Sequence, residues 1–241
     1  SFDGGEALRT PFTAQAVAYN WLSNSSMLDS YSDEKRIQRY ALATVFYSMN
    51  GDAWGNNTGW VTDSDECDWF NTALGGFCNS EGVVVEFDIM YNELEGTIPD
   101  EIALLPFREI NLAGNNLVGS LPTTLGRLTT LVDLLIWGNA LAGPLPSELG
   151  LMTSLETLDL PMNDISGSIP TEIGLLSKLD WLSLSNNALT GSIPSEINDM
   201  PNLNNVYLYG NVALTGSFNC TKTISRCWLS CGNDALECRS L

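Results

Sequence analysis

The middle of this chain repeats itself with a fixed period, and that period limits the possible folds more than any other feature. The segment LETLDLPMNDISGSIPTEIGLLSK, which begins at Leu155, is followed by LDWLSLSNNALTGSIPSEINDMPN, and both share the frame LxxLxLxxNxLxGxIPxxI. The asparagine of this frame recurs at spacings of 23 residues once and 24 residues four times, at Asn92, Asn115, Asn139, Asn163, Asn187 and Asn211. Such a period, with apolar residues locked to it, indicates one supersecondary unit per copy, stacked on its neighbours. Residues 83–218 are therefore predicted to form a solenoid of six repeats.

Each position of the frame has a physical role. The alternating LxL predicts a strand with one buried face. The asparagine follows this strand, where its amide can bond turn backbone groups that no strand ladder satisfies, so we interpret the six asparagines as a structural ladder rather than a catalytic one. The glycine predicts a turn, at Gly96, Gly119, Gly143, Gly167 and Gly191. The proline and the Ser/Thr/Asp-Glu-Ile that follows it predict a short helix or 3-10 turn on the convex side.

The segments that flank the repeats are predicted to cap the rod. Residues 1–30 form an N-terminal extension with a short apolar helix, and residues 31–82 form a helical cap that begins near Ser32 and contains Trp54, Trp60 and Trp69 as core candidates. Residues 219–241 form a cysteine-rich C-terminal cap. Caps are expected because an end repeat would otherwise expose its apolar edge and unpaired strand to water.

All six cysteines lie outside the repeats. Cys67 and Cys78 precede them, and four more follow, at Cys220, Cys227, Cys231 and Cys238. This placement favours disulfide-stapled caps, with Cys67 paired to Cys78 and the last four paired among themselves in one of three ways. A zinc site is the alternative for the last four, but they lack a CxxC pair and the chain has no histidine. We therefore expect disulfides and an oxidising, extracellular compartment.

The GxIP insert after the frame asparagine is typical of the plant-type leucine-rich repeat (LRR). Residues 83–218 resemble the ectodomains of plant receptor kinases and polygalacturonase-inhibiting proteins. The W…CxW…C…GxVxxL pattern around Trp54, Cys67 and Cys78 resembles the cap of such domains, and the string QRYALATVFYSMNGDAW is similar to diatom-type algal LRR proteins. The resemblance implies an α/β solenoid: a right-handed superhelix with a concave parallel β-sheet, mostly 3-10 or short helices and turns on its convex side, and disulfide-stapled caps.

Composition narrows the partners. The formal net charge of −19 disfavours nucleic acid and anionic membranes as binding partners. The sequence has no run of about 18 apolar residues, so we expect no membrane-spanning helix within it. Three sequons agree with a secreted or cell-surface glycoprotein, at Asn24, Asn56 and Asn219. There is no histidine, no GxSxG elbow and no GxxxxGK loop, so we expect neither an enzyme nor a cofactor.

Candidate ligand contacts lie at the strand positions that are free of packing. On the N-terminal side these positions form an acidic zone of Glu86, Asp88, Glu109 and Asp133, where bound calcium is a further option. On the C-terminal side they form an aromatic group of Trp137, Trp181, Tyr207 and Tyr209. Exposed aromatic residues are typical contact anchors. The alternative is that the carboxylates form a solvated face and the rings pack on one another.

Two functions remain open. The first is an extracellular recognition module, receptor-like or inhibitor-like, that binds a protein, peptide or glycan on its concave face. The second is a structural or adhesive protein of the cell surface or extracellular matrix that self-assembles. No motif identifies the ligand.

Overall fold

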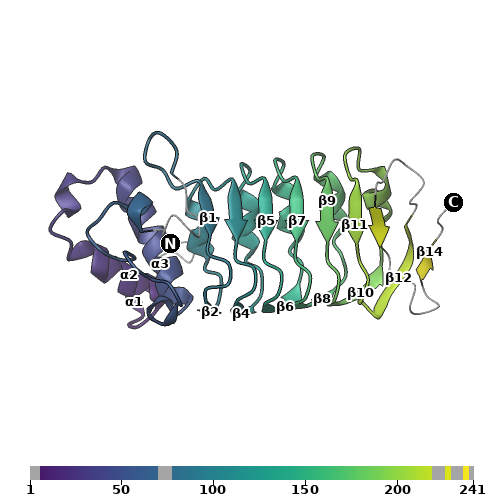
Figure 1. Ribbon diagram of the computed structural model, residues 1–241, viewed down its shortest axis with the longest axis horizontal. Helices are drawn as coiled ribbons and strands as arrows, with labels where there is room; N and C mark the ends of the chain where they lie inside the picture. Colours follow the sequence, from purple (N-terminus) through teal and green to yellow (C-terminus); the bar gives the residue numbers. More distant parts are fainter. Residues whose placement is uncertain (1–5, 70–77, 219–225, 229–235, 239–241) are drawn as a thin grey trace.

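The computed structural model describes residues 6–69, 78–218, 226–228 and 236–238, and for Ser217, Phe218 and the last two segments it describes only the backbone. The chain forms an elongated rod with the helices α1 (Glu6–Arg9), α2 (Ala14–Ser23) and α3 (Asp33–Ser48) packed at one end and a regular array of strands along the rest (Figure 1). The rod is the predicted solenoid, and its parallel strands and short 3-10 turns confirm the α/β class.

One seven-stranded parallel sheet carries the strand of each repeat. Its strands, in spatial order, are β1 (Glu86–Asp88), β3 (Glu109–Asn111), β5 (Asp133–Leu135), β7 (Thr157–Asp159), β9 (Trp181–Ser183), β11 (Asn205–Tyr207) and β13 (Arg226–Trp228). Along the strands of this sheet, residues that face the core alternate with residues that face outward, as in β1, where Phe87 is buried and Glu86 and Asp88 are partly exposed. We call the outward face of this sheet the concave face.

A second seven-stranded parallel sheet was not predicted. It contains β2 (Glu95–Gly96), β4 (Asn116–Gly119), β6 (Ala140–Pro144), β8 (Asp164–Gly167), β10 (Ala188–Ser192), β12 (Ala213–Phe218) and β14 (Leu236–Cys238), along the lower edge of the rod in Figure 1. The prediction of a turn at each frame glycine is wrong, because each of these glycines lies inside or at the end of a strand of this sheet. The positive φ of Gly143, at 85°, bends the chain there without ending its pairing.

The array also runs one strand further than the six predicted repeats. Strands β13 and β14 come from the segment predicted as the C-terminal cap, and they pair in parallel with β11 and β12. This segment lacks the repeat frame, but it can still extend the sheets, because strand pairing uses the backbone N–H and C=O groups that every residue except proline has. Cys220 and Cys231 lie outside the described residues, and Cys227 and Cys238 are described only as strand backbone, so the pairing of these four remains a prediction.

The convex side carries the predicted 3-10 helix in each of the first five repeats, and the described residues of the sixth repeat contain none. The five helices are η4 (Asp100–Leu104), η5 (Thr123–Arg127), η6 (Ser147–Leu151), η7 (Thr171–Leu175) and η8 (Ser195–Asp199). The glycines of η5, η6 and η7 let successive turns approach closely: a Cβ added to Gly150 would lie 2.4 Å from the carbonyl oxygen of Glu172. Between the helices and the two sheets, leucine and isoleucine side chains form one continuous linear core.

The asparagine ladder has the structural role predicted for it. The side-chain oxygen of Asn163 accepts from the backbone N–H of Leu141 at 3.1 Å, and its Nδ2 donates to Ile136 O at 3.0 Å, Leu160 O at 3.2 Å and Pro161 O at 3.3 Å. Asn139 and Asn187 make corresponding bonds in their own repeats. Each asparagine thus joins the end of its own strand to the preceding repeat, where no sheet ladder satisfies these groups.

The N-terminal cap consists of α1 (Glu6–Arg9), α2 (Ala14–Ser23), η1 (Leu28–Ser30), α3 (Asp33–Ser48), η2 (Gly51–Ala53) and η3 (Glu66–Asp68). Ser32 is the N-cap of α3, and its hydroxyl accepts from Lys35 N at 3.2 Å. Trp54, Trp60 and Trp69 are buried core residues, as predicted. Trp60 stacks on Phe46 of α3 and contacts Phe87 of β1, so the core of the cap continues into the first repeat.

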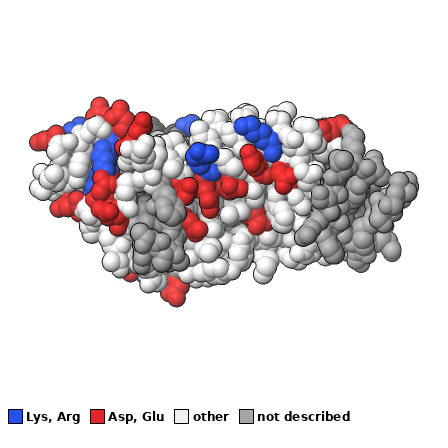
Figure 2. Space-filling view, turned by 45° about the horizontal axis from the view of Figure 1, so that its top comes forward, with Lys and Arg blue, Asp and Glu red and all other residues white. Residues whose placement is uncertain are grey.

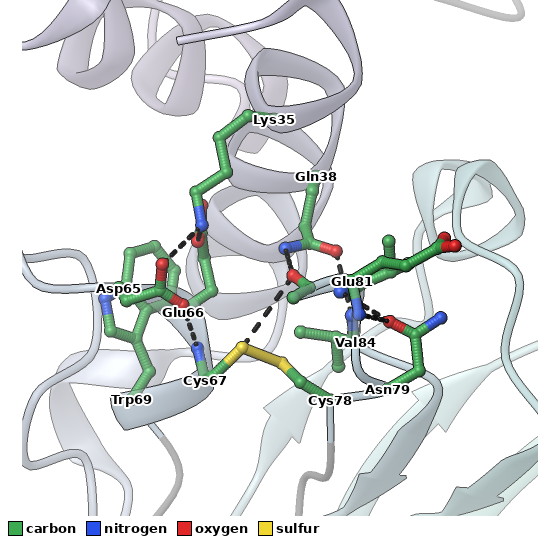
Figure 3. The surroundings of a disulfide bond; sticks show 12 residues. Lys35, Gln38, Asp65, Glu66, Cys67, Trp69, Cys78, Asn79, Glu81 and Val84 are labelled. Atoms are coloured by element: carbon green, nitrogen blue, oxygen red, sulfur yellow. Dashed lines mark hydrogen bonds and ion pairs between the residues drawn. A yellow bond between two sulfur atoms is a disulfide. The ribbon is translucent and has the colours of Figure 1, made fainter. Parts of the chain in front are cut away.

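A disulfide and a buried charge cluster hold the cap together (Figure 3). Cys67 and Cys78 form the predicted bond. Beside it, the fully buried carboxylate of Glu66 pairs with Lys35 and, at 3.5 Å, with Arg39 of α3. The Arg39 guanidinium donates to the carbonyls of Thr62 and Ser64 and lies over three aromatic rings, those of Trp21, Tyr31 and Trp69. The helix α3 is therefore joined to the loop that carries Cys67 by charge as well as by the disulfide.

Candidate ligand-binding face

The strand register places six of the eight predicted contact residues in two columns across the concave face, while Trp137 and Tyr209 follow the ends of β5 and β11. Glu86 pairs with Glu109, Glu109 with Asp133, Asp133 with Thr157, Thr157 with Trp181, and Trp181 with Asn205. A second column runs through Asp88, Asn111, Leu135, Asp159, Ser183 and Tyr207. Neighbours in a column are about 5 Å apart, which is the strand spacing. Equivalent positions of the repeat frame therefore lie side by side on neighbouring strands.

The four carboxylates of the acidic zone lie on three adjacent strands, β1, β3 and β5. Burial, together with the charges of Asp133, Asp88 and Glu86, raises the pKa of Glu109 above the usual glutamate value. Figure 2 shows acidic side chains gathered near the middle of the rod, with a few Lys and Arg side chains above them. The cluster is therefore a zone of negative charge that a cation would relieve.

Removing one carboxylate from this zone should stabilise the protein. A raised pKa means that the folded chain holds the Glu109 proton more tightly than the unfolded chain, so stability falls as pH rises through the raised pKa. We expect Glu109→Gln to raise the free energy of unfolding at pH 7 and to lose this advantage below about pH 4, where glutamate is protonated in both states. Urea unfolding of both proteins at several pH values tests this. A lower stability for the variant at pH 7 would contradict it.

The structure divides the predicted aromatic group into two parts. Trp137 contacts Tyr91, with ring centroids 5.5 Å apart and an angle of 74° between the planes. Tyr91 is 63% exposed and covers Gly114, where an added Cβ would lie 2.4 Å from its ring. The Tyr91–Trp137 pair therefore spans the same repeats as the acidic zone.

Tyr91 is a contact candidate that the sequence columns missed. It immediately precedes Asn92 and lies three residues after the end of β1, outside both columns, and the chain there has a positive φ. The same position in later repeats is occupied by Gly114, Gly138, Met162, Asn186 and Gly210. The sequence does contain a signal for Tyr91: a bulky aromatic residue stands at a repeat position where three other copies have glycine.

The second aromatic pair lies further along the rod. The rings of Trp181 and Tyr207 are 4.7 Å apart and tilted by 36°, and the indole N–H of Trp181 donates to Asp159 Oδ1 at 3.4 Å. Burial raises the pKa of Asp159, against the lowering effect of hydrogen bonds from Ser183 and Trp181. Tyr209 is 41% exposed. Of the four predicted rings, Trp181 and Tyr207 thus pack on each other, whereas Trp137 packs on Tyr91, and both pairs remain partly open to solvent.

Several other predicted features have no direct test here. Among the described residues, no group of three Asp, Glu, Cys or His side chains is arranged to hold a metal ion, so nothing supports the calcium option. Asn24 is exposed and Asn56 is partly exposed, whereas Asn219 lies outside the described residues; glycosylation remains a prediction at all three. In the described part of the chain, no helix has both the length and the apolar character needed to cross a membrane.

Comparison with known proteins agrees with this architecture. The family described as Leucine Rich Repeat matches residues 107–128, 154–176 and 178–200. A TDR receptor is 37% identical over 56% of this chain and 23% of its own length, with a TM-score of 0.54. The Arabidopsis thaliana receptor kinase GASSHO1/SCHENGEN3, whose LRR ectodomain was solved in complex with CASPARIAN STRIP INTEGRITY FACTOR 2, is 30% identical over 68% of this chain and 20% of its own, with a TM-score of 0.63.

A third similar structure has nearly the length of this chain. A chain of the BIR3–SERK2 complex from Arabidopsis thaliana is 29% identical, covers 76% of this chain and 89% of its own, and has a TM-score of 0.58. The present chain therefore spans less than a quarter of the two longer receptors and most of the shorter one. The chain thus contains leucine-rich repeats and is similar to the ectodomains of plant leucine-rich repeat receptors, as the GxIP frame predicts. The resemblance of its cap to diatom-type algal proteins stays a prediction.

Proposed function

We propose that the protein is an extracellular recognition module that binds an extended segment of a protein or peptide across the strands of its concave face. The observation that carries this proposal is the strand register, which aligns Glu86, Glu109 and Asp133 side by side in the same repeats as the Tyr91–Trp137 pair. A cationic side chain would relieve the repulsion among the carboxylates, and an apolar side chain would cover the rings.

The known relatives support this choice of partner. The ectodomain of GASSHO1/SCHENGEN3 was solved with CASPARIAN STRIP INTEGRITY FACTOR 2, and a similar chain comes from a complex of BIR3 with SERK2. In the first of these, the protein in the complex is a leucine-rich repeat ectodomain. For the present chain we infer the same general activity, with a partner whose contact segment is basic and partly apolar.

An extracellular location fits the same evidence. The Cys67–Cys78 disulfide is the kind of bond that persists in oxidising compartments, and the similar structures are ectodomains of receptors. The three sequons agree with passage through the secretory route. A secreted or cell-surface protein is therefore the setting in which we expect binding.

Selection from a random peptide display library tests the proposed function. We expect the enriched peptides to carry Lys or Arg within a few residues of an aromatic or aliphatic side chain. Their affinity should fall roughly tenfold or more in Glu109→Gln/Asp133→Asn, since close charge pairs contribute more than about 1.4 kcal/mol. It should also fall in Trp137→Ala.

A charge-matched variant serves as the control. Asp164→Asn/Glu196→Gln changes the net charge equally, but these two exposed residues lie on the second sheet and on η8. Affinity that fell equally in both double variants would show that only the overall charge matters. Sedimentation of the purified protein addresses the self-assembly alternative: monomers agree with recognition, and filaments or sheets contradict it.

A further inference from the structure

The C-terminal half of the concave face differs in chemistry from the acidic zone. On β7, β9 and β11 and in the residues that directly follow them, the positions on this face are Thr157, Asp159, Pro161, Trp181, Ser183, Ser185, Asn205, Tyr207 and Tyr209. Ser183 and Ser185 are buried, and the other seven are at least partly exposed. This set contains three aromatic rings, hydroxyl and amide groups, a single carboxylate and no cation. This half of the face therefore lacks the clustered carboxylates with which the acidic zone would attract a basic segment. It also lacks the cations that an acidic segment would need.

The single carboxylate is fixed against the rings. Asp159 Oδ1 accepts the indole N–H of Trp181 at 3.4 Å, and the Ser183 side chain also bonds this carboxylate. Trp181 is in turn packed on Tyr207. A carboxylate has about four acceptor positions, so Asp159 can accept further donors from a ligand. The result is a preorganised pair of tilted aromatic rings in contact, with an oriented acceptor bound to one of them.

We propose that Trp181, Tyr207 and Asp159 form a binding site for one ring of a neutral oligosaccharide. A sugar ring presents an apolar C–H surface to an aromatic side chain and hydroxyl donors at its rim, so it can satisfy the rings and the carboxylate together. A purely apolar side chain would bury Asp159 without supplying a donor, which is unfavourable. The site shares no residue with the acidic zone or the Tyr91–Trp137 pair, so it does not depend on the function proposed above.

The test uses a panel of neutral hexasaccharides made of β-1,3-, β-1,4- and α-linked hexoses. Saturation-transfer NMR identifies any member that contacts the intact protein, and calorimetric titration measures its affinity. We expect at least one member to bind the wild type. Trp181→Ala and Asp159→Asn should each weaken that binding about tenfold or more, because one removes the ring and the other the charged acceptor.

Matched variants separate this site from the first one. Trp137→Ala and Glu109→Gln/Asp133→Asn should leave saccharide affinity within about twofold of wild type, while they weaken peptide binding. Trp181→Phe keeps a ring without the N–H donor, so it should bind better than Trp181→Ala if the ring stacks on the sugar. Failure of every saccharide to bind the wild type, unchanged affinity in a folded Trp181→Ala protein, or displacement of the saccharide by peptides selected on the acidic zone would overturn the proposal.

Discussion

Replacing Arg39 with alanine should destabilise the N-terminal cap by about 3 to 5 kcal/mol, because the substitution breaks a buried ion pair. Arg39 is 1% exposed and Glu66 is fully buried, so water cannot replace the lost partner. The same guanidinium donates to the carbonyls of Thr62 and Ser64 and contacts the rings of Trp21, Tyr31 and Trp69. Denaturant unfolding followed by tryptophan fluorescence measures the effect, because the cap contains several buried tryptophans.

Two variants accompany this measurement. Arg36→Ala removes a more exposed cation of the same helix, which pairs with Asp33 at 3.3 Å, and it should change stability by less than about 1 kcal/mol. Arg39→Lys keeps the charge but loses the planar fork that reaches two carbonyls and Glu66 together, so it should recover only part of the loss. Equal unfolding midpoints for Arg39→Ala and Arg36→Ala would contradict the role assigned to the buried pair.

Replacing Asn163 with alanine should cost about 3 kcal/mol or more. The side chain makes four hydrogen bonds to backbone groups, and each buried group left unpaired costs roughly 1 to 3 kcal/mol. The equivalent change at Asn139 should cost less, because Asn139 makes similar bonds at a partly exposed site where water can take its place.

Asn116 gives the matched control, since it is an exposed outward residue of β4 and its replacement by alanine should change stability by less than about 0.5 kcal/mol. Thermal unfolding of the three variants tests the expected order of stability loss, which is largest for Asn163→Ala, smaller for Asn139→Ala and smallest for Asn116→Ala. In the Asn163 and Asn139 variants, binding of peptide and saccharide should decrease only in proportion to the loss of folded protein. A variant of Asn163 that kept its melting temperature but lost ligand would show that the ladder acts in binding.

The repeat period alone predicts most of the fold. It defined the strand columns correctly, because every copy must place equivalent residues in register for its apolar positions to meet one core. The second sheet was missed because glycine is a strong turn signal, while here its positive φ bends a strand that remains paired. Strand β13 was missed because it lies in a segment without the frame.

The candidate site was only partly accessible from the sequence, for two physical reasons. Ring contacts depend on side-chain conformations, which the period does not specify, so Trp137 was grouped with Trp181 when it actually contacts Tyr91. Buried charges are rare, so Glu66 and Arg39 were not expected in the core. A signal was present for Arg39, since it lies three and seven residues before Leu42 and Phe46, on the buried face of α3.

The most direct test of the proposed recognition function is a crystal structure of the protein with a peptide selected for binding. We predict that the peptide crosses β1, β3 and β5 in an extended form, with a Lys or Arg nitrogen within about 4 Å of a carboxylate oxygen of Glu109 or Asp133. An apolar side chain of the peptide should contact the Tyr91–Trp137 pair. A peptide bound to the second sheet, to the 3-10 turns of the convex side or to the helical cap would contradict the assignment of the concave face as the ligand site.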